Sequence, residues 1–236
     1  PLHEWRWKVS QAKDKWREYG QPWAGEPLGQ RILLIWEEQG LGDVLQFSRF
    51  LPHMRSLYSE AGLIFVCRSS LHPVLANMAE REQISLLPAE SAIPGRVQGH
   101  DVHVPLLSLP LHLGCTLSDL PPPTPLSISK STQYFWQKRV SDIRHKNSSH
   151  QRQLGLVWSG SNIQTMAQRR NISLSKLEPL LSLPDVQWHS LQLGDASNEI
   201  QMTKWHNHLV DWSEYLNDFG DTAGLMMALD GVVSVD

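Results

Sequence analysis

Cysteine and long apolar runs are scarce in this sequence, and neither sign of charge dominates. Its two cysteines, Cys67 and Cys115, are too few for a disulfide framework or a zinc site, and they indicate a reducing, cytoplasmic compartment. No apolar run approaches the ~20 residues that span a bilayer, and no signal peptide is visible. Lys and Arg number 21 against 24 Asp and Glu, a net charge of −3, and nothing in this balance suggests the basic stripe that binding of nucleic acid would need. We therefore expect neither a transmembrane segment nor a nucleic-acid partner.

The residues that are present suffice for a folded core. Hydrophobic residues make up 41% of the 236 residues and charged residues 19%, which argues against disorder. At ~150 residues per domain, the length corresponds to about one and a half domains. The chain begins with Pro1 and ends on an apolar run, Gly231 to Asp236, whose pattern predicts a buried strand. Because a native terminus rarely falls on a core strand, we expect a fragment of a longer protein, cut at both ends.

Residues 1–27 differ in texture from the rest of the chain. Good helix formers surround Trp5, Trp7 and Trp16, and a linker containing Pro and Gly surrounds Trp23. This composition predicts one or two short helices whose tryptophans pack against something upstream of the chain.

Residues 28–125 alternate strand-like and helix-like segments. Short apolar runs predict strands at 32–36, 63–67, 84–87 and 101–104, and apolar spacing predicts helices over 43–54 and from a cap at Ser69 or Ser70 to 81. Such alternation is typical of an α/β domain, in which a parallel sheet carries helices on its faces.

A second α/β pattern follows a proline-rich break. Residues 126–153 contain a connector helix over 131–146 and a polar linker. From Leu154 on, the pattern predicts strands at 154–158, 186–191 and 208–211, helices over 173–183, 196–205 and 218–229, and a last strand up to Asp236. We therefore expect a second α/β domain over 154–236 that stops before it is complete.

The turn after the first predicted strand is the first candidate site. It reads Gly40-Leu41-Gly42-Asp43 and lies where open α/β sheets bind ligands, at the carboxyl end of a strand and the start of a helix. Gly40 and Gly42 permit close approach of the backbone, and the helix start offers unpaired N–H groups. The third glycine of the dinucleotide fingerprint is missing. Asp43 is then either the N-cap of the helix or a general base facing a cleft.

Two further candidates lie in the second domain. Ser159 and Ser161 follow its first strand, and Arg169 and Arg170 come shortly before the next helix. Hydroxyls and forked guanidinium donors suit a phosphate, although the same residues also suit a solvated loop. Asp236 stands at the carboxyl end of the last strand, either at the same cleft or as a structural residue. The histidines are scattered, so we expect no metal site.

Six segments, taken in order, resemble the glycosyltransferase domain that follows tetratricopeptide repeats in many bacterial proteins. They are residues 31–52, 104–110, 155–160, 169–173, 190–192 and 221–236. That domain is similar to the family 9 glycosyltransferases, the ADP-heptose–lipopolysaccharide heptosyltransferases. The resemblance covers nearly the whole chain, and residues 3–7 resemble the end of a last repeat. Residues 164–167 depart from the family pattern and shift the alignment of the neighbouring arginines by a few positions.

The resemblance implies the GT-B fold, in which two Rossmann-like domains face each other across a cleft. Residues 28–125 would form the acceptor domain, 154–236 a truncated nucleotide-sugar domain, and 1–27 the end of a tetratricopeptide-like repeat with its linker. Transfer in the family inverts the anomeric centre without a metal. The family uses no cofactor beyond its donor substrate, a nucleotide-diphosphate sugar.

The family's functional residues carry over to the candidates above. Asp43, just after Gly42, matches the base proposed to deprotonate the acceptor hydroxyl, a role compatible with a cap. The two serines and two arginines of the second domain fall near the contacts to the donor diphosphate. Asp236 matches the first residue of the other half of that contact.

We expect a glycosyltransferase that is inactive as these 236 residues alone. Its acceptor would be a glycan, lipopolysaccharide or protein, in the cytoplasm or at the inner face of the cytoplasmic membrane. The alternative is a non-catalytic GT-B-like binding or scaffold module whose upstream repeats recognise a protein partner.

Overall fold

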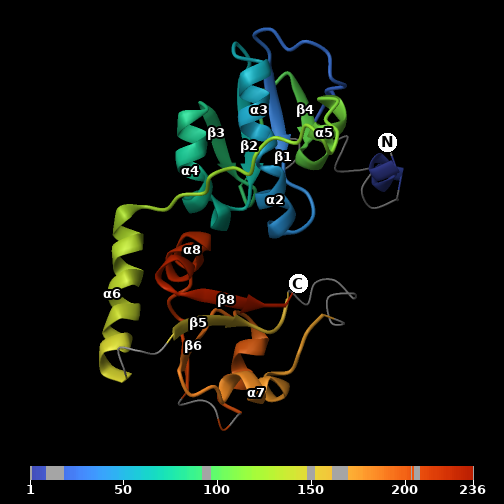
Figure 1. Ribbon diagram of the computed structural model, residues 1–236. Helices are drawn as coiled ribbons and strands as arrows, with labels where there is room; N and C mark the ends of the chain where they lie inside the picture. The colour runs from blue at the N-terminus through green and yellow to red at the C-terminus, as the bar shows by residue number, and fades with distance from the viewer. Residues whose placement is uncertain are drawn as a thin grey trace. The chain divides into compact units, whose positions relative to one another are not determined.

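The structure, a computed structural model, divides the chain into two compact units, residues 1–127 and 128–236 (Figure 1). It describes residues 2–8, 19–91, 97–147, 152–160, 170–202, 204 and 208–235. Each unit is built around a four-stranded sheet in which all described pairings are parallel.

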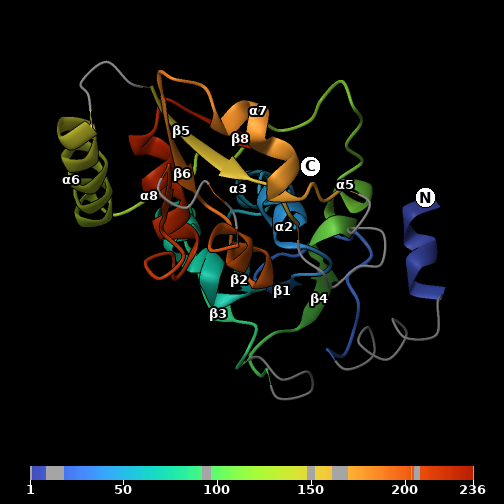
Figure 2. The ribbon, with the colours of Figure 1, turned by 90° about the horizontal axis from the view of Figure 1, so that it is seen from below.

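The first sheet has the strand order β3-β2-β1-β4, which can be followed in Figure 2. The strands are β1 (Ile32–Trp36), β2 (Gly62–Cys67), β3 (Ile84–Pro88) and β4 (Val102–Pro105). Leu33, Leu34 and Ile35 of the inner strand β1 have no exposed surface, as expected for a continuous apolar run that is covered on both faces. All four predicted strands are confirmed to within one residue at each end.

The helices of the first unit follow the predicted alternation with two corrections. They are α2 (Leu41–Phe47), α3 (Phe50–Leu57), α4 (His72–Arg81) and α5 (Leu109–His112), with the 3-10 helices η2 (Ser69–Leu71) and η3 (Leu106–Ser108). The single helix predicted over 43–54 is α2 followed by α3. Pro52 explains the break, because it has no N–H for the carbonyl of Ser48 and its ring would clash with that carbonyl. The predicted serine cap of α4 is wrong, since both serines lie in η2 and the N-cap is Leu71.

The first residues form a 3-10 helix, η1 (Leu2–Lys8), within the first unit. Trp7 lies edge-on to Trp36 at the end of β1, with ring centroids 5.4 Å apart, and Tyr19 stacks on the same indole at 5.2 Å. The expectation that the tryptophans here need an upstream partner is therefore wrong for Trp7. The helix predicted from the helix-forming residues at 9–18 lies outside the described residues.

The second sheet repeats the topology of the first, in the order β7-β6-β5-β8. Its strands are β5 (Arg152–Val157), β6 (Val186–Ser190), β7 (Leu209–Asp211) and β8 (Gly231–Ser234). The predicted strands are confirmed, but β8 is not buried. Among the described strands it pairs only with β5, and Val232 and Val233 are 36% and 42% exposed. An apolar run by itself does not tell an edge strand from an inner one.

Helical segments complete the second unit. They are α6 (Lys130–Asn147), η5 (Leu174–Leu177), α7 (Glu178–Leu181), η6 (Asp195–Ile200) and α8 (Phe219–Ala228). The helix predicted over 173–183 is η5 followed by α7, because Pro179 interrupts the backbone ladder. Asp218 caps α8 by accepting a hydrogen bond from the N–H of Asp221 at 3.0 Å. In the parts of the chain that the structure describes, no helix has the length and apolar character to cross a membrane.

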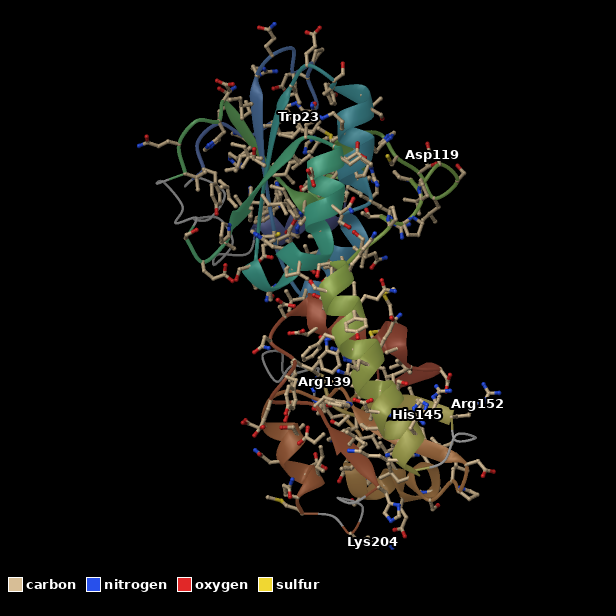
Figure 3. All side chains as sticks on the ribbon, turned by 90° about the vertical axis from the view of Figure 1, so that its left-hand side faces the viewer. Trp23, Asp119, Arg139, His145, Arg152 and Lys204 are labelled. Atoms are coloured by element: carbon tan, nitrogen blue, oxygen red, sulfur yellow. The ribbon has the colours of Figure 1, made fainter. Side chains whose placement is uncertain are left out.

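Helix α6, which the sequence predicts as a connector, packs within the second unit against α8. The helix can be followed in Figure 3, where Arg139 is labelled on it. Trp136 is completely buried and donates from Nε1 to Asp221 Oδ1 at 3.2 Å. Gly224 permits the close approach, because a Cβ at this position would lie 2.5 Å from Trp136 Cδ1.

Candidate functional site

Both sheets reverse their strand order beside the first strand. In the first unit the chain runs from β1 outward to β2 and β3 and then crosses to β4 on the other side of β1. The second unit does the same around β5, with β8 as the crossing strand. Open parallel sheets bind ligands at the carboxyl ends of the two strands that flank such a reversal. We call the carboxyl ends of β1 and β4 the first switch point, and those of β5 and β8 the second.

Gly40, Gly42 and Asp43 follow β1 and therefore lie at the first switch point. The N-cap of α2 is Gly40, so the alternative of Asp43 as N-cap is wrong. Asp43 is instead the third helical residue, and its Oδ2 accepts a hydrogen bond from the Gly40 N–H at 3.0 Å. Asp43 is partly buried, and among the described residues its Oδ1 has no hydrogen-bond partner. The carboxylate can hold the turn with one oxygen and accept a proton with the other.

The sequence pattern did not reveal a polar cluster at the same switch point. Glu38, two residues after β1, accepts hydrogen bonds from Arg6 Nε at 2.7 Å and Arg6 Nη2 at 2.6 Å. The Leu107 N–H, just after β4, donates to Glu38 Oε1 at 3.2 Å. Arg6 Nη2 also donates to Ser108 Oγ at 2.9 Å, and that hydroxyl donates to Glu4 at 3.0 Å. The helix η1 thus contacts the residues that follow both β1 and β4.

Pairing sets the charge of this cluster. Burial alone would raise the pKa of Glu4, but the hydrogen bonds from Arg6 and Ser108 and the positive charge of Arg6 hold it below its ordinary value. Burial alone would lower the pKa of Arg6, but Glu38 and Glu4 raise it above its ordinary value. The side chains of Arg6 and Glu38 are 16% and 8% exposed. The ion pair is therefore a partly desolvated, bidentate one rather than a solvated surface pair.

A buried glutamine holds the loop at the second switch point. The Oε1 atom of Gln192, beyond β6, accepts hydrogen bonds from the N–H of Trp158 at 3.1 Å and of Ser159 at 2.9 Å. Its Nε2 donates to the carbonyls of Ser159 at 3.0 Å and Leu193 at 2.9 Å. One amide therefore fixes the backbone that follows β5. The sequence placed Gln192 in a family-like segment without indicating this role.

Of the residues predicted to bind phosphate, the structure describes only Ser159 and Arg170. The Ser159 hydroxyl donates to the carbonyl of Gly160 at 3.2 Å, so in this structure it shapes the loop. The Gly160 N–H donates to Asn171 Oδ1 at 2.9 Å, which ties the loop to the turn next to the exposed Arg170. Three other predicted site residues lie outside the described residues: Ser161, Arg169 and Asp236.

Each unit also buries a histidine that accepts a hydrogen bond from a tryptophan. Trp36 Nε1 donates to His103 Nδ1 at 3.2 Å, and Trp212 Nε1 donates to His189 Nδ1 at 3.0 Å. Burial lowers the pKa of His189 to about 4, so its ring is neutral, and its Nε2 donates to Gln153 Oε1 at 2.9 Å. These imidazoles are core residues. Across the described ranges, no group of three or more His, Cys, Asp or Glu side chains is placed to hold a metal ion.

The repeated topology defines the class of protein. Two α/β units in series, each with a four-stranded parallel sheet of the same strand order, give a GT-B-like fold of the kind seen in heptosyltransferase structures. The first of these is E. coli ADP-heptose lps heptosyltransferase II, which is similar over 87% of this chain and 79% of its own, with a TM-score of 0.56 and 13% identity.

Two further solved structures share this fold. The glycosyl transferase family 9 protein from Veillonella parvula DSM 2008 is similar over 89% of this chain and 76% of its own, with a TM-score of 0.55 and 10% identity. Dodecameric iron-containing heptosyltransferase TibC, in complex with ADP-D-beta-D-heptose, is similar over 89% and 55%, with a TM-score of 0.57 and 12% identity. At these identities the likeness establishes the fold.

Sequence comparison adds one curated relative. No family model matches the chain. Protein FlbA of Caulobacter vibrioides is 24% identical over 227 residues, which cover 91% of this chain and 38% of FlbA. The chain thus spans well under half the length of that relative. The tetratricopeptide-like repeat expected at residues 1–27 stays a prediction.

Proposed function

We propose that the protein is a glycosyltransferase that moves a sugar from a nucleotide-diphosphate sugar to an acceptor hydroxyl, without a metal and with inversion. The observation that carries this proposal is the position of Asp43. It follows β1 at the first switch point, where Gly40 holds one carboxylate oxygen and leaves the other open to a proton. The fold shared with heptosyltransferase structures, one of them a complex with ADP-D-beta-D-heptose, supports the choice of donor class.

In this proposal Asp43 acts as general base. Its carboxylate takes the proton of the acceptor hydroxyl while the hydroxyl oxygen attacks the anomeric carbon of the donor sugar. The bond from this carbon to the diphosphate breaks, and the nucleotide diphosphate leaves from the opposite face, so the anomeric centre is inverted. General-base catalysis of this kind typically contributes ~10²–10⁴-fold to the rate.

The donor diphosphate is assigned to the second switch point. Gln192 fixes the backbone of Trp158 and Ser159, so these two residues are held in place before a ligand arrives, which lowers the entropic cost of binding. Arg170 lies on the turn bound to this loop and offers forked donors to phosphate oxygens. The proposed set is completed by Ser161, Arg169 and Asp236.

Two variants of one residue separate the base role from the structural role. Asp43→Asn keeps an oxygen for the Gly40 N–H but cannot take up the proton, whereas Asp43→Ala loses both functions. In the protein at its full natural length, both should lower transfer by ~10²–10⁴-fold and leave nucleotide affinity unchanged. Only the alanine variant should also lose about 1 kcal/mol of stability. Turnover by Asp43→Asn equal to that of the parent would sink the base assignment.

A non-catalytic GT-B-like binding or scaffold module is the second candidate, and one observation favours it. Arg6 and Glu4 already engage Glu38 and Ser108, the polar groups that an acceptor would meet at the first switch point. A module of this kind would show no change in melting temperature with any nucleotide sugar, whereas the transferase would be stabilised by its donor. The acceptor, a glycan, lipopolysaccharide or protein, and the cytoplasmic location stay predictions.

A further inference from the structure

A pocket of about 520 Å³ opens in the first unit beside η1. Most of its lining residues are apolar, among them Phe47 of α2, Phe50 of α3, Leu107 of η3 and Leu111 of α5. Glu4 of η1 contributes a polar part of the wall. The volume falls within the ~300–1,000 Å³ of pockets that hold small molecules.

Exposed leucines surround this pocket. Leu111, Leu117 and Leu120 line it, and each is an exposed apolar side chain. The loop that carries the last two, on which Figure 3 labels Asp119, is held by that carboxylate, which accepts hydrogen bonds from the N–H and the hydroxyl of Thr116. This hydrogen-bonded loop places exposed apolar side chains at the pocket. Such side chains indicate a ligand with an apolar body.

One cation in the pocket wall has no carboxylate among the described residues to balance it. Arg49 donates from Nε to the carbonyl of Gln46 at 3.0 Å and from Nη1 to the carbonyl of Pro121 at 3.4 Å. Within the described ranges it forms no ion pair. The other charge in the wall, that of Glu4, is already balanced by Arg6 at 2.9 Å. A partly buried cation beside apolar surface selects a ligand that carries an anion.

We propose that this pocket binds a small amphipathic anion, with the apolar body among Phe47, Phe50 and Leu111 and the anionic group at Arg49. The inference goes beyond the proposed function, because none of the residues proposed to carry the sugar transfer lines this pocket and its occupation requires no transfer.

The two cysteines provide the readout. Cys115 lines the pocket, so a bound molecule shields its thiol. Cys67 is completely buried, and burial raises the pKa of its thiol to about 12, so it reacts only when the first unit unfolds. Labelling with N-ethylmaleimide, with each cysteine followed separately by mass spectrometry, therefore distinguishes occupation of the pocket from denaturation. The probes are decanoate and decanol, which share one chain and differ in charge, each used below its self-association concentration.

We expect decanoate to slow the labelling of Cys115 about tenfold more than decanol does at the same concentration, because only decanoate pairs with Arg49. Arg49→Gln should remove this difference and leave the weaker protection by decanol. The matched variant Arg81→Gln, at an exposed arginine paired with Glu82, should keep the difference between the two probes. Leu111→Trp, which fills the pocket from an exposed position, should abolish protection by both probes.

Three results would overturn the proposal. The first is equal protection by the two probes, or protection by neither, in the parent protein. The second is labelling of Cys67 together with Cys115 in the presence of decanoate, since the probe would then be unfolding the unit. The third is protection of Cys115 by phosphatidylglycerol vesicles but not by decanoate, which would make the leucines a membrane contact instead of a small-molecule site.

Discussion

Replacing Gln192 by methionine removes the amide that holds the loop after β5 and keeps a side chain of similar length. The variant loses the hydrogen bonds from the N–H groups of Trp158 and Ser159 and those to the carbonyls of Ser159 and Leu193. Gln192 is only 4% exposed, so water replaces these partners poorly. A buried donor left unsatisfied costs ~1–3 kcal/mol. With two such N–H groups, we expect the second unit to lose about 2–6 kcal/mol of unfolding free energy.

Urea titration followed by hydrogen exchange and mass spectrometry reports this loss for the second unit separately from the first. Gln201→Met, at an exposed position after η6, is the matched control and should stay within about 0.5 kcal/mol of the parent. The N–H groups of residues 158 and 159 should also exchange faster in Gln192→Met alone. If the two variants are equal in stability and in exchange of this loop, the amide does not hold the loop and the reasoning is refuted.

The remaining predictions concern packing and charge. Gly224→Ala places a Cβ 2.5 Å from Trp136 Cδ1 and should cost about 1–3 kcal/mol in chemical unfolding of the second unit. For His189, the pKa is about 4 in the folded protein against an ordinary 6.5. As the pH falls from 6.5 toward 4, the unfolded chain binds a proton that the folded unit does not, so the unfolding free energy should fall by about 3 kcal/mol. This pH dependence should be absent in His189→Gln, and its persistence there would contradict the assignment. Arg6→Gln should speed hydrogen exchange in residues 2–8, whereas the more exposed Arg68→Gln should leave that exchange unchanged.

The strands of both sheets could be predicted because each is a short apolar run bounded by turn residues. The helices were harder to predict, because the spacing of apolar residues does not show where a proline lacks the N–H that the helix needs. Pro52 and Pro179 each divide a helical pattern into two shorter helices. The exposure of β8 was missed for a related reason. Its apolar residues indicate a strand, whereas its burial depends on how many strands flank it in the sheet.

The candidate site could be predicted where it depends on strand ends. Asp43 and the loop of Ser159 follow the first strand of their respective units, and the carboxyl ends of parallel strands are where ligands bind. The contacts that hold these places could not be predicted. Arg6 meets Glu38 across 32 residues, and Gln192 reaches Trp158 across 34. A single sequence carries no local pattern for such pairings.

Hydrogen exchange of the protein at its full natural length, with and without a panel of nucleotide diphosphates and nucleotide sugars, tests the central claim most directly. A glycosyltransferase with its donor site at the second switch point should show slower exchange at residues 158–160 and 170–173 with at least one nucleotide of the panel. The same nucleotide should raise the melting temperature. Unchanged exchange in both segments with every nucleotide, at concentrations in the millimolar range, would contradict the claim and favour the non-catalytic module.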